Sequence, residues 1–473
     1  MNAKLPSRRQ RPARLGRALL TALALVLAPD IRPALAQTQV QAAMETTVFT
    51  VIVTRHGVRS FTNPGPPYIW TPWAPVEKDN DLTAHGYRLM KLMGQFYRGA
   101  QAGKGLPVNC ATPTAYVYAD TAQRTLGTAH ALIEGLCDPS SPAALDVFHT
   151  TNPDGNDPMF DATQRLFQLH KVDGIESKAA VAAVAGNPPA SIVLKHASDF
   201  VTFQKLLDSR CGPATCPPLA SAPSTIDIAM LAGLTGPVAT ASTYAENIFL
   251  EFAQCRPEGE ITGLGGEQLR ATLDAGMRLH VVAYDVNARN SYNPLVRGGT
   301  LIAHIAAMLD HKAGRKGVLD TIGIPDLDGT TLVVFSGHDT ELGSLGGILE
   351  AHWNPEGGIM RDDMPPGAAL IFDLVKSPAG FGVRISLAAM AREAYRAEAP
   401  FTGPLKPVAF TGCPDGGCIM PLAQLEAVAL TLQALGLVVA GWDASSVPLP
   451  QDPGSVTKLK DPTWTDAKCR GGP

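Results

Sequence analysis

Residues 46–59 read TTVFTVIVTRHGVR, and this stretch decides the fold class of the chain. Its first part, residues 46–53, is β-branched or apolar at every position and is too short for a typical helix. Such an uninterrupted run is typical of a strand that is buried on both faces in a parallel sheet. The run ends at Arg55-His56-Gly57, so the sequence predicts a buried strand that stops at charged and polar residues.

The segments that follow alternate between helical and strand patterns. A loop rich in Pro, Trp and Gly, residues 63–75, leads into helical periodicity over residues 82–99. A short strand is predicted at residues 115–118 and a helix at about 124–136. Strand, loop and helix in repetition predict an α/β fold with crossover connections.

The middle of the chain, residues 161–289, has a different pattern. Helical periodicity dominates there and strand signals are few, as in residues 200–207, 244–252 and 269–286. We therefore expect a helical insertion.

The α/β pattern returns after the insertion. A helix near residues 301–309 precedes a strand at 331–335, which again ends in a polar triplet, Gly337-His338-Asp339. The expected organisation is an α/β domain in two parts, residues 45–160 and 290–473, on either side of the insertion.

The first 36 residues are expected to be a signal peptide. Basic residues precede an apolar run, residues 18–28, that is too short to span a bilayer, and Ala34-Leu35-Ala36 fits the small-x-small cleavage pattern. An uncleaved anchor is the alternative, and the shortness of the run argues against it. The mature protein, from Gln37, is predicted to be periplasmic or secreted and to have no membrane anchor.

The expected mature chain is acidic. It has 32 basic and 42 acidic residues, a net charge of about −10. A nucleic-acid partner is therefore not expected. An anionic substrate would have to be attracted by a local cluster of arginines, because the overall field repels it.

The eight cysteines agree with export, because an oxidising compartment lets them pair and an even number leaves none over. Counting does not give the connectivity. Two pairs, Cys211 with Cys216 and Cys413 with Cys418, are close enough in sequence to clip tight loops. A zinc site built from the two pairs is the alternative, which is disfavoured because thiolates in an exported chain usually oxidise.

Polar residues that suit phosphate chemistry follow three of the predicted strands: Arg55, His56 and Arg59; Asp120 and Arg124; His338 and Asp339. Ligands of open α/β sheets bind outside the carboxyl ends of the strands, so these groups are expected to meet. Guanidinium groups neutralise phosphate oxygens and an imidazole attacks in line, which suits phosphoryl transfer. Each residue also has a plain structural interpretation, for example Asp339 as the cap of a helix that begins near Glu341.

The motifs around these residues resemble those of the histidine acid phosphatases. Arg55-His56-Gly57-Val58-Arg59 matches the RHGxR signature, and Gly337-His338-Asp339-Thr340 is similar to the distal HD motif, about 280 residues later. The segments DLTAHGY, ADTAQRT and PPGAALIF are also similar to family segments. The resemblance covers nearly the whole mature chain and is greatest with the bacterial periplasmic phytases, glucose-1-phosphatases and broad acid phosphatases.

The resemblance implies both a fold and an activity. The fold is a phosphoglycerate mutase-like three-layer α/β/α domain with a helical insertion domain. The activity is hydrolysis of small-molecule phosphate monoesters without a metal or other cofactor, with broad specificity or a preference for phytate or sugar phosphates. His56 would become a phosphohistidine and Asp339 would protonate the leaving oxygen. The phosphate would be held by Arg55, Arg59, Arg124 and His338.

Physical chemistry agrees with these roles. Nearby positive charges lower the pKa of His56, so a neutral nucleophile persists in acid, and acidic conditions are expected to favour a protonated Asp339. Gly57 is expected to let the backbone approach the imidazole and fix its tautomer.

The resemblance further implies three disulfides and shows two departures near the site. The implied pairs are Cys110–Cys137, Cys211–Cys216 and Cys413–Cys418, which leaves Cys255 to pair with Cys469. Phe61 stands where many relatives have proline, and Asn63 where some phytases have a basic residue. Thr62, between them, is a candidate contact with the substrate.

Two other functions were weighed. A catalytically silent phosphate-ester binding protein would keep the fold, but the retention of both histidines and Asp339 argues against it. A mutase would use the same phosphohistidine, but the expected leader and the insertion disfavour it.

Overall fold

The computed structural model describes residues 45–62, 80–137, 145–152, 155–211, 217–315, 317 and 319–447. The predicted signal peptide and Asn63 lie outside these ranges. The predicted bridges Cys211–Cys216 and Cys255–Cys469 each involve a residue outside them. Within the described residues, no helix is long and apolar enough to cross a membrane.

A mixed sheet forms the centre of the α/β part. Its strand order is β10-β8-β7-β1-β6-β2-β3-β11, with β9 beside β8. Strands β1, β6, β2 and β3 run parallel, and the strands at both edges are antiparallel to their neighbours. The bounds are β1 Thr46–Arg55, β2 Ala115–Ala119, β3 Val147–His149, β6 Leu332–Gly337, β7 Ala369–Ser377, β8 Gly380–Ala388, β9 Lys406–Pro407, β10 Ile419–Pro421 and β11 Ser445–Val447.

Strand β1 is buried on both faces, as its sequence predicts. Ile52 joins the apolar cluster on one face of the sheet, whereas Val51 and Val53 join the cluster on the other face. Only one of its neighbours, β6, is parallel; β7 is antiparallel. The apolar run therefore predicted burial on both faces correctly. It did not predict that one of the two neighbouring strands is antiparallel.

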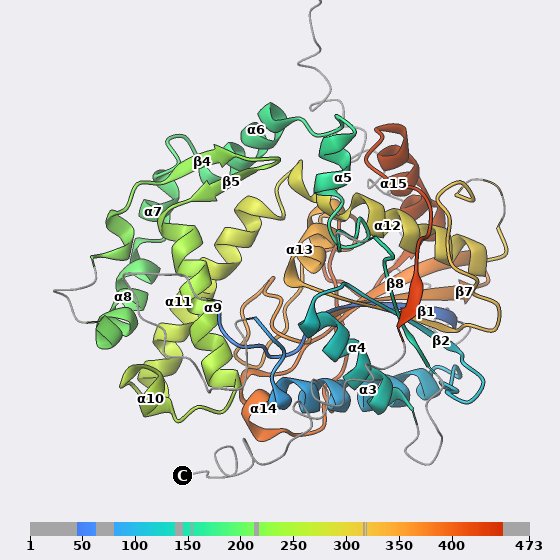
Figure 1. The fold of residues 1–473 in the computed structure, drawn as a ribbon, viewed down its shortest axis with the longest axis horizontal. Coiled ribbons are helices and arrows are strands. Elements are labelled where there is room, and N and C mark those ends of the chain that lie inside the picture. The colour runs from blue at the N-terminus through green and yellow to red at the C-terminus, as the bar shows by residue number, and fades with distance from the viewer. Residues whose placement is uncertain are drawn as a thin grey trace, which may run out of the picture.

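Helices cover the sheet in two layers (Figure 1). Helices α3 (Ala84–Gly103) and α4 (Gln123–Leu136) cover one face. The other face is covered by α12 (Asn293–Lys312), α13 (Asp339–Ile348) and α15 (Leu422–Ala434). The helices α5 (Thr163–Gln168) and α14 (Arg392–Ala397) are shorter. This arrangement is the three-layer α/β/α architecture that the resemblance implies.

The inserted region lies beside the sheet and is mainly helical (Figure 1). Its helices are α6 Gly174–Ala185, α7 Ser191–Lys195, α8 Ala197–Cys211, α9 Pro237–Ala253, α10 Glu258–Thr262 and α11 Gly266–Asn287, with a 3₁₀ turn at Leu219–Ser221. It also contains a hairpin of β4 (Thr225–Ile228) and β5 (Ala232–Thr235). Each of these strands has four residues, too few for a period-two pattern to stand out. The domain division itself remains a prediction.

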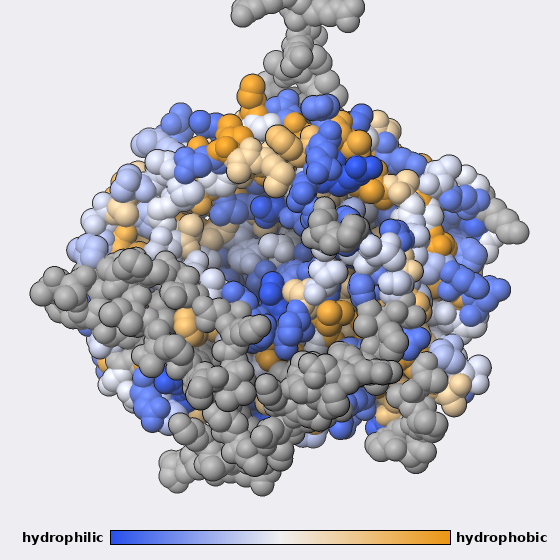
Figure 2. Space-filling view, in the orientation of Figure 1, coloured by the Kyte–Doolittle hydropathy of each residue, from blue (hydrophilic) through white to orange (hydrophobic). Residues whose placement is uncertain are grey.

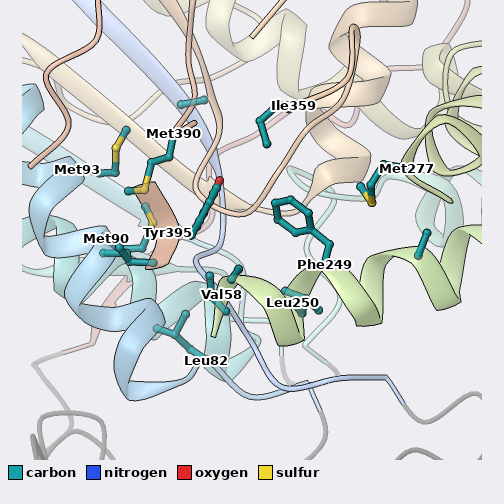
Figure 3. Packing of buried hydrophobic residues seen from close by; sticks show 14 of the residues in the cluster. Val58, Leu82, Met90, Met93, Phe249, Leu250, Met277, Ile359, Met390 and Tyr395 are labelled. Atoms are coloured by element: carbon teal, nitrogen blue, oxygen red, sulfur yellow. The ribbon is translucent and has the colours of Figure 1, made fainter. Parts of the chain in front are cut away.

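The insertion packs against the α/β part through a continuous apolar cluster (Figure 3). Phe249 of α9 meets Tyr395 of α14 edge to face, with ring centroids 5.6 Å apart. Val58, which follows β1, and Met90 of α3 belong to the same cluster. The loop that carries the RHGxR motif is therefore held between the two parts of the molecule.

Two of the disulfides that the resemblance implies are present. Cys110–Cys137 ties the segment before β2 to the end of α4, the helix that carries Arg124, and Cys413–Cys418 closes a tight loop before β10. Such bridges agree with folding in an oxidising compartment.

The amino end of α3 is fastened to the loop after β1. The N–H of Thr83 donates to the carbonyl of Val58 (3.0 Å), and the Thr83 hydroxyl caps the helix by accepting from the N–H of Gly86. A Cβ on Gly86 would lie 2.0 Å from the carbonyl oxygen of Val58. Only glycine allows this approach.

We expect Gly86→Ala to lower the free energy of unfolding by about 1–3 kcal/mol, because backbone must move to admit the methyl group. The matched control is Gly99→Ala in the same helix, where an added Cβ meets nothing within 4 Å. It is expected to raise the free energy of unfolding by about 0.5–1 kcal/mol through helix propensity. Denaturant unfolding of both variants measures the two effects, and equal effects would contradict the proposed fastening.

Candidate active site

The carboxyl ends of β1, β6 and β2 lie side by side. Arg55 pairs with Gly337 in the parallel register of β1 and β6, and Ala119 pairs with Ser336 between β2 and β6. The N–H of His56 donates to the carbonyl of Gly337 at 2.8 Å. The three polar groups that were predicted to meet therefore do so.

The imidazole of His56 is buried, and its tautomer is set by the backbone. Nδ1 lies 2.8 Å from the carbonyl oxygen of Gly57, which can only accept, so Nδ1 carries the proton and Nε2 keeps its lone pair. Burial lowers the pKa of His56 well below its ordinary value, and the charges of Arg55, of His338 and of two further arginines lower it more. His56 is therefore a neutral imidazole, and the lone pair of its Nε2 is available for attack.

Gly57 has the role expected of it, since its carbonyl meets the imidazole. A Cβ at this position would lie 2.7 Å from Cγ of Met90 and 3.0 Å from the carbonyl oxygen of Gly86. A larger residue would displace the backbone that orients His56.

Three guanidinium groups stand around this histidine. Arg55 ends β1, Arg59 follows in the same loop, and Arg124 projects from α4, where its Nη2 lies 3.3 Å from Nδ1 of His338. Asp339 and Glu246 raise the pKa of Arg55 although its burial alone would lower it. Arg55 therefore stays charged inside the protein.

His338 is held by Asp120. Its Nε2 lies 2.7 Å from Oδ2 of Asp120 and donates to it, and its ring centroid lies 5.5 Å from that of His56. Burial would lower the pKa of His338, but the hydrogen bond that it donates to Asp120 and the charge of Glu341 raise it. With Nε2 engaged, Nδ1, beside Arg124, is the nitrogen that can donate to a phosphoryl oxygen.

Asp339 is the first residue of α13, but it does not cap that helix. His338 is the N-cap residue, and Oδ2 of Asp339 lies 2.9 Å from Nη2 of Arg55. Burial would raise the pKa of Asp339, yet Arg55 and a hydrogen bond with Tyr284 lower it far below the ordinary value. The expectation that acid favours a protonated Asp339 is therefore wrong for the free enzyme, because Arg55 neutralises the carboxylate.

Two residues of the insertion also contact the site, and the sequence did not predict them. Glu246 of α9 bridges Arg55 and Arg59, with Oε2 at 3.0 Å from Nη2 of Arg59, and Tyr284 of α11 bonds Asp339. Neither lies in a motif next to a strand end. For Glu246 the available signal was its charge, because a carboxylate on a largely buried helix needs a cationic partner.

The candidate contact Thr62 is tied to the insertion rather than free. Its N–H donates to Oδ1 of Asn247 (3.0 Å) and its carbonyl accepts from Nδ2 of Asn247 (2.8 Å). Its hydroxyl accepts from Nη1 of Arg59 at 3.1 Å. The neighbouring Phe61 is buried in the apolar cluster, which accounts for an apolar residue in place of proline.

Figure 2 shows a hollow between the insertion and α13, with mainly hydrophilic residues around it. Beside His338 lies a cavity of about 350 Å³ whose charged lining is acidic, with Asp120, Asp157, Asp161 and Glu341. Among the described residues, no group of three or more His, Cys, Asp or Glu side chains is arranged to hold a metal ion.

Comparisons with known proteins find similar phytases. The chain is 28% identical to the phytase AppA of Escherichia coli over 375 residues, which cover 75% of this chain and 82% of that relative. It is also 28% identical to the Hafnia alvei phytase solved with tartrate, with a TM-score of 0.71 over 82% of this chain and 97% of the other. These similarities support the assignment of the chain to the histidine acid phosphatase family. No protein-family model matches it.

As a histidine acid phosphatase, the protein is a phosphoric monoester hydrolase, and the predicted family, fold class and reaction are confirmed. The Hafnia alvei enzyme in complex with myo-inositol hexakis sulphate gives a similar match, with 27% identity and a TM-score of 0.69 over 82% of this chain and 97% of the other.

Proposed function

We propose that this histidine acid phosphatase forms a phosphohistidine at His56 and that phytate is its principal substrate, in the periplasm or outside the cell. The observation that carries the proposal is the free Nε2 of His56 among Arg55, Arg59 and Arg124, with Asp339 beside them. This set supplies a nucleophile, counter-charges for phosphate oxygens and an acid in one place.

In the first step, Nε2 of His56 attacks phosphorus and the ester P–O bond breaks. The three arginines and His338 neutralise the phosphoryl oxygens, and a proton from Asp339 passes to the leaving oxygen. The products are the free alcohol and the phosphohistidine.

In the second step, water attacks the phosphohistidine. The carboxylate of Asp339 takes a proton from that water, the P–N bond breaks, and inorganic phosphate leaves. His56 returns to its neutral form, with Nδ1 still bonded to Gly57.

The choice of phytate rests on charge and on the relatives. Two relatives are named as phytases, and one of them, the Hafnia alvei enzyme, was solved with the hexasulphate of myo-inositol. The described residues that line the cavity beside His338 include no Lys or Arg to neutralise further phosphates, so the remaining phosphates of phytate are expected on the opposite side, towards the insertion. The disulfides and the predicted leader support an exported location.

A panel of substrates tests this function. We expect kcat/KM at acidic pH to be highest for phytate and lower for glucose 1-phosphate, a nucleotide and an aryl phosphate, with a chelator present throughout. A preference for another ester would contradict the choice of phytate and leave the reaction class standing. Loss of all activity in the chelator, restored by added metal, would contradict the metal-free mechanism.

A further inference from the structure

Glu246 occupies the place where a phosphate clamp would hold its anion. Its two carboxylate oxygens bond two different arginines, Oε1 with Nη2 of Arg55 and Oε2 with Nη2 of Arg59. The side chains are largely buried, with 14% of Glu246, 2% of Arg55 and 8% of Arg59 exposed. A carboxylate that bridges two guanidinium groups imitates the oxygens of a phosphoryl group.

The remaining donors of these arginines are largely committed. Nη1 of Arg55 donates to the carbonyl of Met364 at 2.6 Å, and its Nη2 is shared by Glu246 and Asp339. Nη1 of Arg59 donates to the carbonyl of Ser60 and to Thr62. Among the described residues, Nε of Arg55 is buried without a hydrogen-bond partner, so an incoming phosphoryl group competes with Glu246 for Nη2 of Arg55 and Nη2 of Arg59.

We propose that Glu246 is an internal anion of the clamp: a bound phosphoryl group takes its place on Arg55 and Arg59, and the Glu246–Asp339 pair takes up one proton as this happens. The inference rests on the proposed function, because it assumes that this clamp is the phosphate site. It adds a partner for the acid and a link between binding and protonation.

The two carboxylates depend on the same counter-charge. Both bond Nη2 of Arg55 in the free enzyme. Once an anionic phosphoryl or sulfate group draws on that charge, two neighbouring buried carboxylates cannot both remain ionised. The proton belongs to the pair, and its arrival supplies the acid that Asp339 lacks in the free enzyme.

The direction of the pKa of Glu246 supports this reasoning. Burial alone would raise the pKa of Glu246, and Arg59 and Arg55 lower it below its ordinary value. An anion bound to the arginines offsets this lowering. Burial and repulsion by Asp339 then raise the pKa of Glu246. The charged or titratable groups that face Glu246 are Arg55 and Arg59 of the motif loop, Asp339 of α13, His280 and Tyr284 of α11, and Asp363 before β7.

Calorimetric titration with myo-inositol hexasulfate tests the proposal, because this probe neither titrates near pH 5 nor is a phosphate ester. Titrations at pH 5 in two buffers of different ionisation enthalpy give the number of protons taken up. We expect about 0.5–1 proton per site in the wild type. The Glu246→Gln variant is expected to bind the probe about tenfold or more tightly than the wild type does, and to take up less than half as many protons.

The matched control is Glu258→Gln in α10, where the carboxylate pairs with Arg270 at 3.0 Å and is not part of the clamp. It should match the wild type in affinity and proton uptake. The proposal is overturned if the wild type takes up no proton on binding the probe. It is also overturned if Glu246→Gln takes up as many protons as the wild type and binds the probe no more tightly. The second result would place the proton on His56, His280 or Asp363.

Should Glu246→Gln not fold, the wild type alone carries the test. Its affinity for the hexasulfate is expected to rise about tenfold or more between pH 6 and pH 4, and a constant affinity would overturn the proposal. Since the probe is not turned over, these results do not depend on whether a phosphohistidine forms.

Discussion

Replacing His56 with alanine is expected to lower kcat on every phosphate ester by a factor on the order of 10⁵ or more, because the variant lacks the attacking atom. The fold is expected to persist, since the imidazole contacts polar groups of the site and its loss does not open the apolar cores. A phosphohistidine is labile in acid and stable in alkali. Labelled substrate quenched in alkali should therefore leave label on the wild type and none on the variant.

The control is His311→Ala, which removes an exposed imidazole from the last turn of α12. This variant should keep the wild-type kcat and the label. A folded His56→Ala protein that retains more than a small fraction of the activity, or that still becomes labelled, would show that another group is the nucleophile.

The fold and most of the site could be predicted because their signals are local. The apolar run of β1 and the shorter one of β6 each stop at a polar motif, and the meeting of strand ends follows from the geometry of parallel sheets. Helix bounds differed by a few residues, as for α3, which begins at Ala84 rather than Leu82. These differences leave the position of the site unchanged.

The role of Glu246 could not be predicted, because its partners are remote. Arg59 lies 187 residues earlier in the chain than Glu246. Helix α9 carries no sequence motif that indicates which of its faces lies towards the site. The packing of α9 against the α/β part, with Phe249 against Tyr395 of α14, brings the carboxylate to the arginines. A single sequence holds no record of that packing.

The ionisation of Asp339 was predicted wrongly for a similar reason. Acid protonates an ordinary carboxyl group, but this one is buried against Arg55 and bonded by Tyr284, and both keep it charged. The position of a general acid follows from a motif, whereas its pKa depends on neighbours that the motif does not contain.

Asp339→Asn is expected to discriminate between leaving groups. A general acid matters only as far as the leaving oxygen needs a proton, and an inositol or sugar alkoxide needs one far more than a nitrophenolate does. The variant should therefore lose activity on phytate or glucose 1-phosphate more than on an aryl phosphate, by about 10²-fold or more in relative terms. Activity on both classes of ester will also fall by a common factor, because Arg55 loses the negative charge with which it pairs.

His338→Ala provides the contrast. Its imidazole, held by Asp120, is assigned to phosphoryl oxygens that every substrate has, so its loss should slow alkyl and aryl esters by similar factors. Values of kcat/KM for the two classes of ester at acidic pH measure both variants, with a chelator present.

Equal losses on both classes in Asp339→Asn would make Asp339 a clamp residue and place the proton donor elsewhere. The carboxyl group that shares Nη2 of Arg55 is Glu246, so it would be the first candidate. Glu246→Gln, assayed with the same two esters, would then show the discrimination that Asp339→Asn lacked. If Asp339 is the donor, Glu246→Gln should instead slow alkyl esters less than Asp339→Asn does, because it removes the partner of the acid and leaves the acid in place.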